Sequence, residues 1–340
     1  MGSKKINCWE FMKCGRGPSE ETGETCEKCP AALKSAFDGM NEGTNAGRSC
    51  WLVAGTFCNE KPVGTFAEKL ASCRDCAFYK QVSDREGQSS LHIQNIDIFA
   101  YTHPGLVRPS NEDRYLIKTM EDESLLLAVA DGLGGDVSSD FAAEITKGKL
   151  AGLRRLRNGN ESEELETFVK KLDLIIRHKA DSHPELANMA TTLICIVLKS
   201  DIIHWINVGD SRFYILRNNR LIQVTEDQTL ARALVAQGEL TPEEAKDHFS
   251  RKILDQCVGY GISDPETGSV NVMKEDLLIL SSDGLYNMVP ETSILAILKG
   301  PETIEEKTKA LVNAALRAGG EDNITIVLAH IKEILFKSGE

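Results

Sequence analysis

Residues 125–132 read Leu-Leu-Leu-Ala-Val-Ala-Asp-Gly, a run of apolar side chains that ends on a carboxylate. Residues 277–284, Leu-Leu-Ile-Leu-Ser-Ser-Asp-Gly, follow the same pattern. A buried strand that ends on a negative charge is unfavourable unless a positive charge meets it. Several such strand ends brought together would provide hard oxygen ligands of the kind that bind Mg²⁺ or Mn²⁺. The two stretches therefore predict buried strands whose acidic ends meet at a metal site.

Strand-like and helix-like segments alternate on both sides of these stretches, from Ile96 onward. Strands are predicted at Ile96–Tyr101, Asp113–Thr119, Ser124–Ala130, Thr192–Leu198, Ile202–Val208, Phe213–Leu216, Ser269–Met273, Leu277–Ser281 and Ile324–Ile331. Helices are predicted at Ser139–Arg157, Glu161–Asp181, Glu226–Gly238, Thr241–Asp247, Glu291–Leu298 and Glu302–Ala318. Successive strand–turn–strand units favour antiparallel sheets with paired helices, which is an α+β layout.

Eight of the ten cysteines fall within residues 8–76 and form two similar quartets. The first quartet is Cys8, Cys14, Cys26 and Cys29, and the second is Cys50, Cys58, Cys73 and Cys76. Each closes with C-x-x-C, a loop that lets two thiolates converge on one ion. Structural Zn²⁺ and an iron–sulfur cluster both suit this spacing. Disulfides are the third alternative, although a cytoplasmic chain is kept reduced.

Composition and charge define the class of protein. With 340 residues, 41% hydrophobic and 26% charged, the chain is expected to be soluble and globular. The net charge of −12 belongs to residues 91–340, because residues 1–90 hold equal numbers of basic and acidic groups. That balance argues against sequence-independent binding of nucleic acid. No apolar run is long enough for a membrane span or a signal peptide, so a cytoplasmic location is expected.

The domain organisation follows from these changes of pattern. Residues 1–81 are predicted to form a small cysteine-rich module that binds a metal or a cluster, because the segment has little amphipathic regularity. The polar, Ser/Gln-rich residues 82–95 are predicted to be a linker. Residues 96–332 form the large α+β domain, and residues 333–340 a tail.

Six motifs occur in one order along the large domain. They are Arg108-x-x-Asn111-Glu112-Asp113, Val129-Ala130-Asp131-Gly132-Leu133-Gly134-Gly135, Met189-Ala190-Thr191-Thr192, Val208-Gly209-Asp210-Ser211-Arg212, Ser281-Ser282-Asp283-Gly284 and Glu321-Asp322-Asn323-Ile324-Thr325. Together they resemble the metal-dependent PPM (type 2C) protein serine/threonine phosphatases in their bacterial form, over about residues 93–332. The resemblance implies a four-layer αββα sandwich, in which two antiparallel sheets are flanked by helix pairs. Residues 6–80 resemble the two-CW module found beside bacterial signalling domains.

The resemblance also implies a metal site that holds two Mn²⁺ or Mg²⁺ ions, or three when a more loosely held third ion binds. Its implied ligands are Asp131, the Gly132 carbonyl, Asp283, Asp322, Glu112 through water, and Asp210 at the third ion. Arg108 would clamp the phosphate, since a guanidinium engages two phosphoryl oxygens at once. Asp113 would orient the nucleophile or accept its proton. The family reaction is hydrolysis by a water that bridges the metals, because its pKa falls towards neutrality.

Two positions depart from the family pattern. Animal members place a His after the Asp-Gly pair, whereas this chain has Leu133, as bacterial relatives do. The general acid is therefore not identified. Ala190 stands where a Gly commonly precedes the Thr pair, which adds a methyl group but removes no ligand.

The implied function is an Mn²⁺/Mg²⁺-dependent phosphatase acting on phosphoserine and phosphothreonine, regulated by the cysteine-rich module. Its partners would be proteins phosphorylated by a serine/threonine kinase. The alternative is a metal- or redox-sensing signalling protein whose phosphatase-like domain acts mainly as a binding partner. A phosphatase for a small phosphorylated molecule is a third hypothesis. The acids at Asp131, Asp283 and Asp322 favour catalysis, because inactive relatives lose them.

Overall fold

The computed structural model describes residues 5–18, 28–33, 44–45, 47–48, 50, 53, 56–58, 61–62, 73, 76–82, 87–93, 95–134, 139–261 and 264–333. The chain divides into two compact units, Met1–Gly87 and Gln88–Glu340. Cys26, Gly135 and residues 334–340 of the predicted tail lie outside the described residues. In the described part of the chain, no helix is both long and apolar enough to span a membrane.

The first unit has short elements around a small aromatic core. Its elements are α1 (Cys8–Met12), the 3-10 helix η1 (Pro30–Ala32), β1 (Phe57–Cys58), β2 (Lys61–Pro62) and α3 (Ala77–Lys80). Trp9 and Phe78 are buried, and the ring of Phe78 lies 5.2 Å from that of Phe11. The buried Arg48 donates its Nη1 to the carbonyl oxygen of Ile6 at 2.8 Å. These contacts stabilise the described part of the first unit.

The second unit is built on two antiparallel sheets. The five-stranded sheet has the order β13–β10–β9–β6–β5, and the six-stranded sheet has the order β12–β11–β14–β15–β4–β3. The strands of the first are β5 (Arg114–Thr119), β6 (Leu125–Ala130), β9 (Leu193–Lys199), β10 (Ile202–Val208) and β13 (Glu266–Asn271). Those of the second are β3 (Gln88–Ile93), β4 (Ile96–His103), β11 (Arg212–Arg217), β12 (Arg220–Gln223), β14 (Leu277–Ser281) and β15 (Ile324–Ile331).

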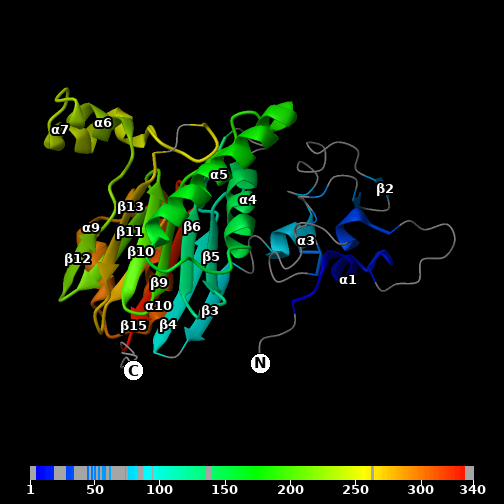
Figure 1. Cartoon of the computed structure of the whole chain (residues 1–340), viewed down its shortest axis with the longest axis horizontal. Coiled ribbons are helices and arrows are strands. Elements are labelled where there is room, and N and C mark those ends of the chain that lie inside the picture. The colour runs from blue at the N-terminus through cyan, green and yellow to red at the C-terminus, as the bar shows by residue number, and fades with distance from the viewer. Residues whose placement is uncertain are drawn as a thin grey trace. The chain divides into compact units, whose positions relative to one another are not determined.

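The main core lies between the two sheets and a second core lies beneath helices. Buried Leu127, Ile196, Phe213 and Val327 belong to the core that joins the sheets. The helices α4 (Ser139–Ala151) and α5 (Glu161–Ser182) pack against the five-stranded sheet, as Figure 1 shows. The six-stranded sheet packs instead against α8 (Asp283–Tyr286), α9 (Glu291–Leu298) and α10 (Ile304–Arg317). The predicted α+β class, two antiparallel sheets flanked by helices, is confirmed.

A helical segment projects from one end of the sheets. It contains α6 (Leu230–Ala236), α7 (Pro242–Asp247) and the 3-10 helix η6 (Phe249–Lys252), and stands apart at the upper left of Figure 1. A further 3-10 helix, η5 (Pro184–Leu186), leads into the short strand β8 (Ala190–Thr191), which pairs with β7 (Gly132–Leu133). The two-residue β7–β8 ladder lies beside the acidic loop at Asp131.

The structure corrects several boundaries predicted from sequence, and two of them concern the linker and the first long helix. Residues 88–93, expected within the linker 82–95, form β3 and pair with β4 along its length. Their side chains alternate between exposed and half-buried, as in an edge strand, and the polar residues on its exposed face concealed the pattern. The helix expected to reach Arg157 ends at Ala151. Lys118 donates its Nζ to the carbonyl oxygens of Ala151 and Leu153 there, at the helix end next to Gly152.

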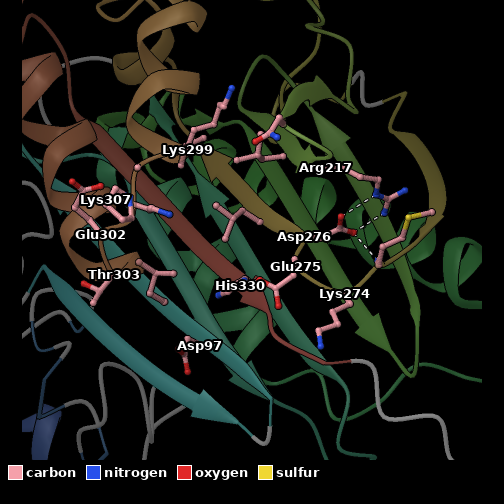
Figure 2. Close-up of a pocket in the computed structure, with 18 of the residues that line it drawn as sticks. Asp97, Arg217, Lys274, Glu275, Asp276, Lys299, Glu302, Thr303, Lys307 and His330 are labelled. Carbon is pink, nitrogen blue, oxygen red and sulfur yellow. Dashed lines mark hydrogen bonds and ion pairs between the residues drawn. The ribbon is translucent and has the colours of Figure 1, made fainter.

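The two ends of the six-stranded sheet carry different groups. At the end away from the acidic loops lies a pocket of about 740 Å³, shown in Figure 2. Arg217, the last residue of β11, donates its Nε and Nη2 to the carboxylate of Asp276 at 2.9 and 2.6 Å. Asp276 directly precedes β14 and is fully buried. This ion pair therefore lies at the end of the six-stranded sheet that is opposite the acidic loops.

Candidate active site

The acidic loops lie at one end of both sheets because antiparallel register places strand ends opposite one another. In the five-stranded sheet, Arg114 pairs with Ala130, so the Glu112–Asp113 loop and Asp131 are neighbours. In the six-stranded sheet, Ser281 pairs with both Arg212 and Ile326, which brings together three further acids. These are Asp210, Asp283 and Asp322.

The carboxylates of this cluster repel one another. Asp131 keeps part of its surface exposed, yet desolvation raises its pKa well above the usual range, and four neighbouring carboxylates raise it further. These four, in order of effect, are Asp113, Asp283, Asp210 and Asp322. Burial is also the main reason that the pKa values of Asp113 and Asp283 rise to about 7 and that of Asp210 to about 6. A concentration of buried negative charge such as this one is stabilised by cations.

Two oxygen atoms in the cluster have no hydrogen-bond partner. They are Oδ1 of Asp113 and Oδ1 of Asp283, and both are buried within the described part of the second unit. Among the described residues, no group of three His, Cys, Asp or Glu side chains has the arrangement of a metal cage. The donors are carboxylate and carbonyl oxygens, which are the ligands that Mn²⁺ and Mg²⁺ prefer. The site therefore fits divalent cations of this kind.

Asp131 and Gly132 are fixed through their backbone by the Thr pair. The carbonyl oxygen of Asp131 accepts hydrogen bonds from the amide of Thr192 at 2.8 Å and from Oγ1 of Thr191 at 2.9 Å. Gly132 pairs with Thr191 in the β7–β8 ladder, and the neighbouring Ala190 is fully buried. Ala190 pairs with Leu133 in that ladder, so the extra methyl group leaves the ladder intact.

Asn323 joins the first acidic loop to the last. Its Oδ1 accepts from the amide of Glu112 at 2.7 Å, and its Nδ2 donates to the carbonyl oxygens of Pro104 and Ser110 at 2.9 Å. A Cβ atom on Gly284 would lie 2.0 Å from the carbonyl oxygen of Asn323. The glycine after Asp283 is thus required because the backbone of this loop passes against it.

Arg108 lies at the rim of the cluster and is about half exposed. Its Nη2 donates to Oδ2 of Asp322 at 2.7 Å. This hydrogen bond is the main reason that the pKa of the guanidinium is raised, with smaller contributions from the charges of Glu112 and Asp131. Arg108 therefore lies next to carboxylates that are also expected to bind the metal ions.

Comparison with known proteins adds to this geometry. Residues 108–319 match the family model described as Protein phosphatase 2C. The chain belongs to the protein phosphatase 2C family. The serine/threonine phosphatase Stp of Listeria monocytogenes is 36% identical over 233 residues, which is 67% of this chain and 92% of Stp. The expected enzyme class is confirmed, and the chain is a protein serine/threonine phosphatase.

Solved structures agree with this assignment. The crystal structure of the Mycobacterium tuberculosis serine/threonine phosphatase PstP/Ppp has a TM-score of 0.64 and 33% identity, and the match covers 70% of this chain and 99% of that one. A structure of the catalytic domain of PstP in complex with two manganese ions has a TM-score of 0.62 and 32% identity, over 70% of this chain and 99% of that one. The second unit therefore has the fold of the 2C phosphatases.

Ser282 is a residue of this phosphatase whose role the sequence did not indicate. Its Oγ donates to Oδ2 of Asp113 at 2.6 Å and accepts from the amide of Thr325 at 3.0 Å. One carboxylate oxygen of Asp113 is thus fixed while the other has no partner. The Ser-Ser-Asp-Gly motif contained Ser282, but the sequence gives no sign that it reaches a residue 169 positions earlier.

Asn287 and Tyr286 are two further residues at the acidic end of the phosphatase that sequence reasoning missed. Nδ2 of Asn287 donates to Oδ2 of Asp283 at 2.9 Å, and its Oδ1 accepts from Arg251 at 3.3 Å. The hydroxyl of Tyr286 donates to the carbonyl oxygen of Asp210 at 2.8 Å. The spacing of Asn287, four residues after Asp283 on a helical turn, is the signal that could have identified it.

The cysteine quartets of the first unit are described only in part. Cys29, Cys50 and Cys73 are buried, Cys8 and Cys76 are half-buried, and Cys14 is exposed. Cys26 lies outside the described residues, and only the backbone of Cys58 is described. The six described thiols form no disulfide with one another, and the choice between Zn²⁺ and an iron–sulfur cluster stays a prediction.

Proposed function

We propose that the acidic end of the second unit hydrolyses phosphoserine and phosphothreonine in proteins with the help of bound Mn²⁺ or Mg²⁺ ions. The residues that would hold the ions are Asp131, the Gly132 carbonyl, Asp283 and Asp322, with Glu112 acting through water and Asp210 serving a third ion. The observation that carries this proposal is the cluster of mutually repelling carboxylates with two unpartnered buried oxygens. When bound, the ions would lower the pKa of a water molecule and neutralise charge on the phosphoryl oxygens.

The chain's own residues would then orient the substrate and the nucleophile. The Nη2 of Arg108 donates a hydrogen bond to Asp322, and the other N–H groups of the guanidinium would bind phosphoryl oxygens. Asp113 has an unpartnered Oδ1, which would accept a hydrogen bond or a proton from the attacking water. Leu133 carries no proton to donate, so the departing serine or threonine oxygen is protonated from elsewhere.

The substrates that we propose are proteins phosphorylated by a serine/threonine kinase of the same cell. The name of the Listeria relative, a serine/threonine phosphatase, supports phosphoproteins over small phosphorylated molecules.

The test is hydrolysis of a phosphothreonine peptide by metal-stripped protein with and without Mn²⁺. We expect activity only with the metal, and we expect Asp131→Asn to reduce kcat/KM by at least about a hundredfold, since it removes a proposed ligand of both ions. The control is Asp97→Asn, at the end of the six-stranded sheet away from the acidic loops, and this variant should keep its activity. Full activity of Asp131→Asn, or activity in excess chelator, would contradict the proposal.

We also propose that the cysteine-rich module binds Zn²⁺ or an iron–sulfur cluster and regulates the phosphatase. The two quartets closing with C-x-x-C support this, as does their fusion to a catalytic domain. Elemental analysis and a visible spectrum of protein purified without oxygen separate zinc from iron. Phosphatase rates that stay equal with the module loaded, stripped or oxidised would exclude regulation by the cysteines.

A further inference from the structure

A group of three charged side chains is buried behind the first acidic loop. Arg114 is the first residue of β5 and directly follows Asp113 in the chain. Its Nε donates to Oε2 of Glu144, and its Nη2 lies 3.6 Å from Oδ2 of Asp140. The side chains of Arg114, Glu144 and Asp140 are 9%, 1% and 7% exposed. Both acids belong to α4, which lies outside the five-stranded sheet (Figure 1).

Burying three charges is unfavourable, and such a group is weak as a source of stability alone. Apolar residues of similar volume would fill the same space at less loss of hydration energy. The geometry indicates what the charges provide instead. Nη1 of Arg114 donates to the carbonyl oxygens of Asn111 at 2.9 Å and Asp113 at 2.8 Å. The guanidinium therefore holds the backbone on both sides of Glu112, and the two acids of α4 hold the guanidinium.

The same helix is also connected to the second acidic loop. Asp131 and Gly132 precede α4 by only a few residues in the chain, and α4 packs against β7 and β8, the ladder that fixes Gly132. It packs against β5 as well. The position of α4 thus determines the distance between the loop of Glu112 and Asp113 and the loop of Asp131.

We propose that Arg114, Glu144 and Asp140 form a brace that sets the spacing of these two loops and thereby the affinity for the divalent ions. The inference rests on the proposed metal site. The three are positioning residues, because the contacts described above join them to one another and to the backbone of the first acidic loop. Sites of this kind depend on partners that hold the ligands within about 0.5 Å of their working positions. Loss of such a partner typically weakens metal binding about 10- to 100-fold.

The experiment titrates Mn²⁺ by calorimetry into metal-stripped full-length protein and its variant Glu144→Gln. The amide keeps the shape and can still accept the hydrogen bond, but the charge that holds Arg114 is lost. We expect Mn²⁺ affinity about 10-fold weaker or more, with kcat reduced at saturating Mn²⁺ and KM for the phosphopeptide little changed. Asp140→Asn, at the longer contact, should fold even if Glu144→Gln does not, and should weaken Mn²⁺ binding to a smaller degree.

The matched control is Asp276→Asn, which weakens the Arg217–Asp276 ion pair at the opposite end of the six-stranded sheet (Figure 2). Asp276 is 1% exposed, as Glu144 is, so both variants should lower the unfolding temperature in chelator. Only the brace variants should bind Mn²⁺ more weakly. Unchanged affinity in both brace variants, or an equal loss in Asp276→Asn, overturns the brace. Absence of Mn²⁺ binding by the unchanged protein overturns the metal site itself.

Discussion

Ser282 supports Asp113 with a single hydroxyl group. Its Oγ is the donor to Asp113 Oδ2, so Ser282→Ala removes this hydrogen bond from the buried carboxylate. A hydrogen bond to a charged group contributes about 1.5–3 kcal/mol. We therefore expect kcat/KM for a phosphopeptide to fall about tenfold or more, mainly in kcat, because the carboxylate loses its fixed direction while Arg108 still binds phosphate.

Ser89→Ala is the control for this change. Ser89 makes a hydroxyl contact of the same length, 2.6 Å, with Tyr115, but it lies on the edge strand β3. Its loss should leave kcat unchanged. A Ser282→Ala enzyme with the same kcat as the unchanged protein would show that Asp113 needs no such support.

The two cysteines of the second unit are predicted to be unreactive. Burial raises the pKa of Cys195 to about 12 and is also the main reason that the pKa of Cys257 rises to about 11. The thiolate is the reactive form, so both groups are almost wholly protonated at pH 8. Iodoacetamide at pH 8 should alkylate them at least about tenfold more slowly than free cysteine, and unfolding in guanidinium should remove the difference. Rapid labelling of the folded fragment 88–340 would contradict this prediction.

Single residues of the site differed in how far the sequence revealed them. An acid at the end of an apolar run, such as Asp131 or Asp283, is visible because the pattern is local. Ser282 and Asn323 act on residues 169 and 211 positions away, and only the strand register brings them there. Local patterns thus indicated the acids of the cluster, whereas the residues that orient them could be recognised only from the fold.

The junction of β14 and α8 depends on close packing against the last acidic loop. Gly284→Ala would place a methyl group 2.0 Å from the carbonyl oxygen of Asn323. We expect a loss of about 1–3 kcal/mol in the free energy of unfolding, as overpacking typically causes. Displacement of Asn323 should also move the amide of Glu112 and weaken Mn²⁺ binding. Urea unfolding and Mn²⁺ calorimetry measure the two effects.

Gly152→Ala is the control at the level of the element. The added methyl group would meet its nearest atom, the carbonyl oxygen of Lys149, at 3.3 Å, near the end of α4. Its effect on stability should be small and its effect on Mn²⁺ affinity absent. If the two glycine variants changed stability and Mn²⁺ affinity to the same degree, close packing at Gly284 would not be required for the site.

The success of sequence prediction also differed between elements. The bounds of β14, β15 and α9 were predicted correctly, because their apolar residues lie in continuous runs or in helical spacing. The strands β3 and β12 were missed, since each lies at an edge of the six-stranded sheet and alternates exposed with half-buried residues, without a continuous buried apolar run. Edge strands are recognisable from their neighbours more than from their own residues.

At the scale of the whole molecule, we predict that residues 88–340 fold and act alone. Both hydrophobic cores and all strands of the two main sheets lie within this unit. The fragment should unfold cooperatively and hydrolyse a phosphopeptide with Mn²⁺. A fragment of residues 96–340 is the sharper comparison, because it lacks β3 and exposes the edge of β4. It should melt at a lower temperature and aggregate more readily. Equal stability of the two fragments would mean that β3 contributes nothing.

The pairing of β4 with β15 has a consequence for the synthesis of the protein on the ribosome. These neighbouring strands belong to opposite ends of the large domain's sequence, and Ile96 lies opposite Ile331. A ribosome makes the chain from its N-terminus at about 5–20 residues per second. Until β15 emerges, the nascent chain lacks Asp322 and Asn323, and β4 has only β3 of its two neighbouring strands. The acidic end of the two sheets is therefore complete only after the chain has emerged beyond β15, and a chain truncated before Asp322 is expected to hydrolyse no phosphopeptide.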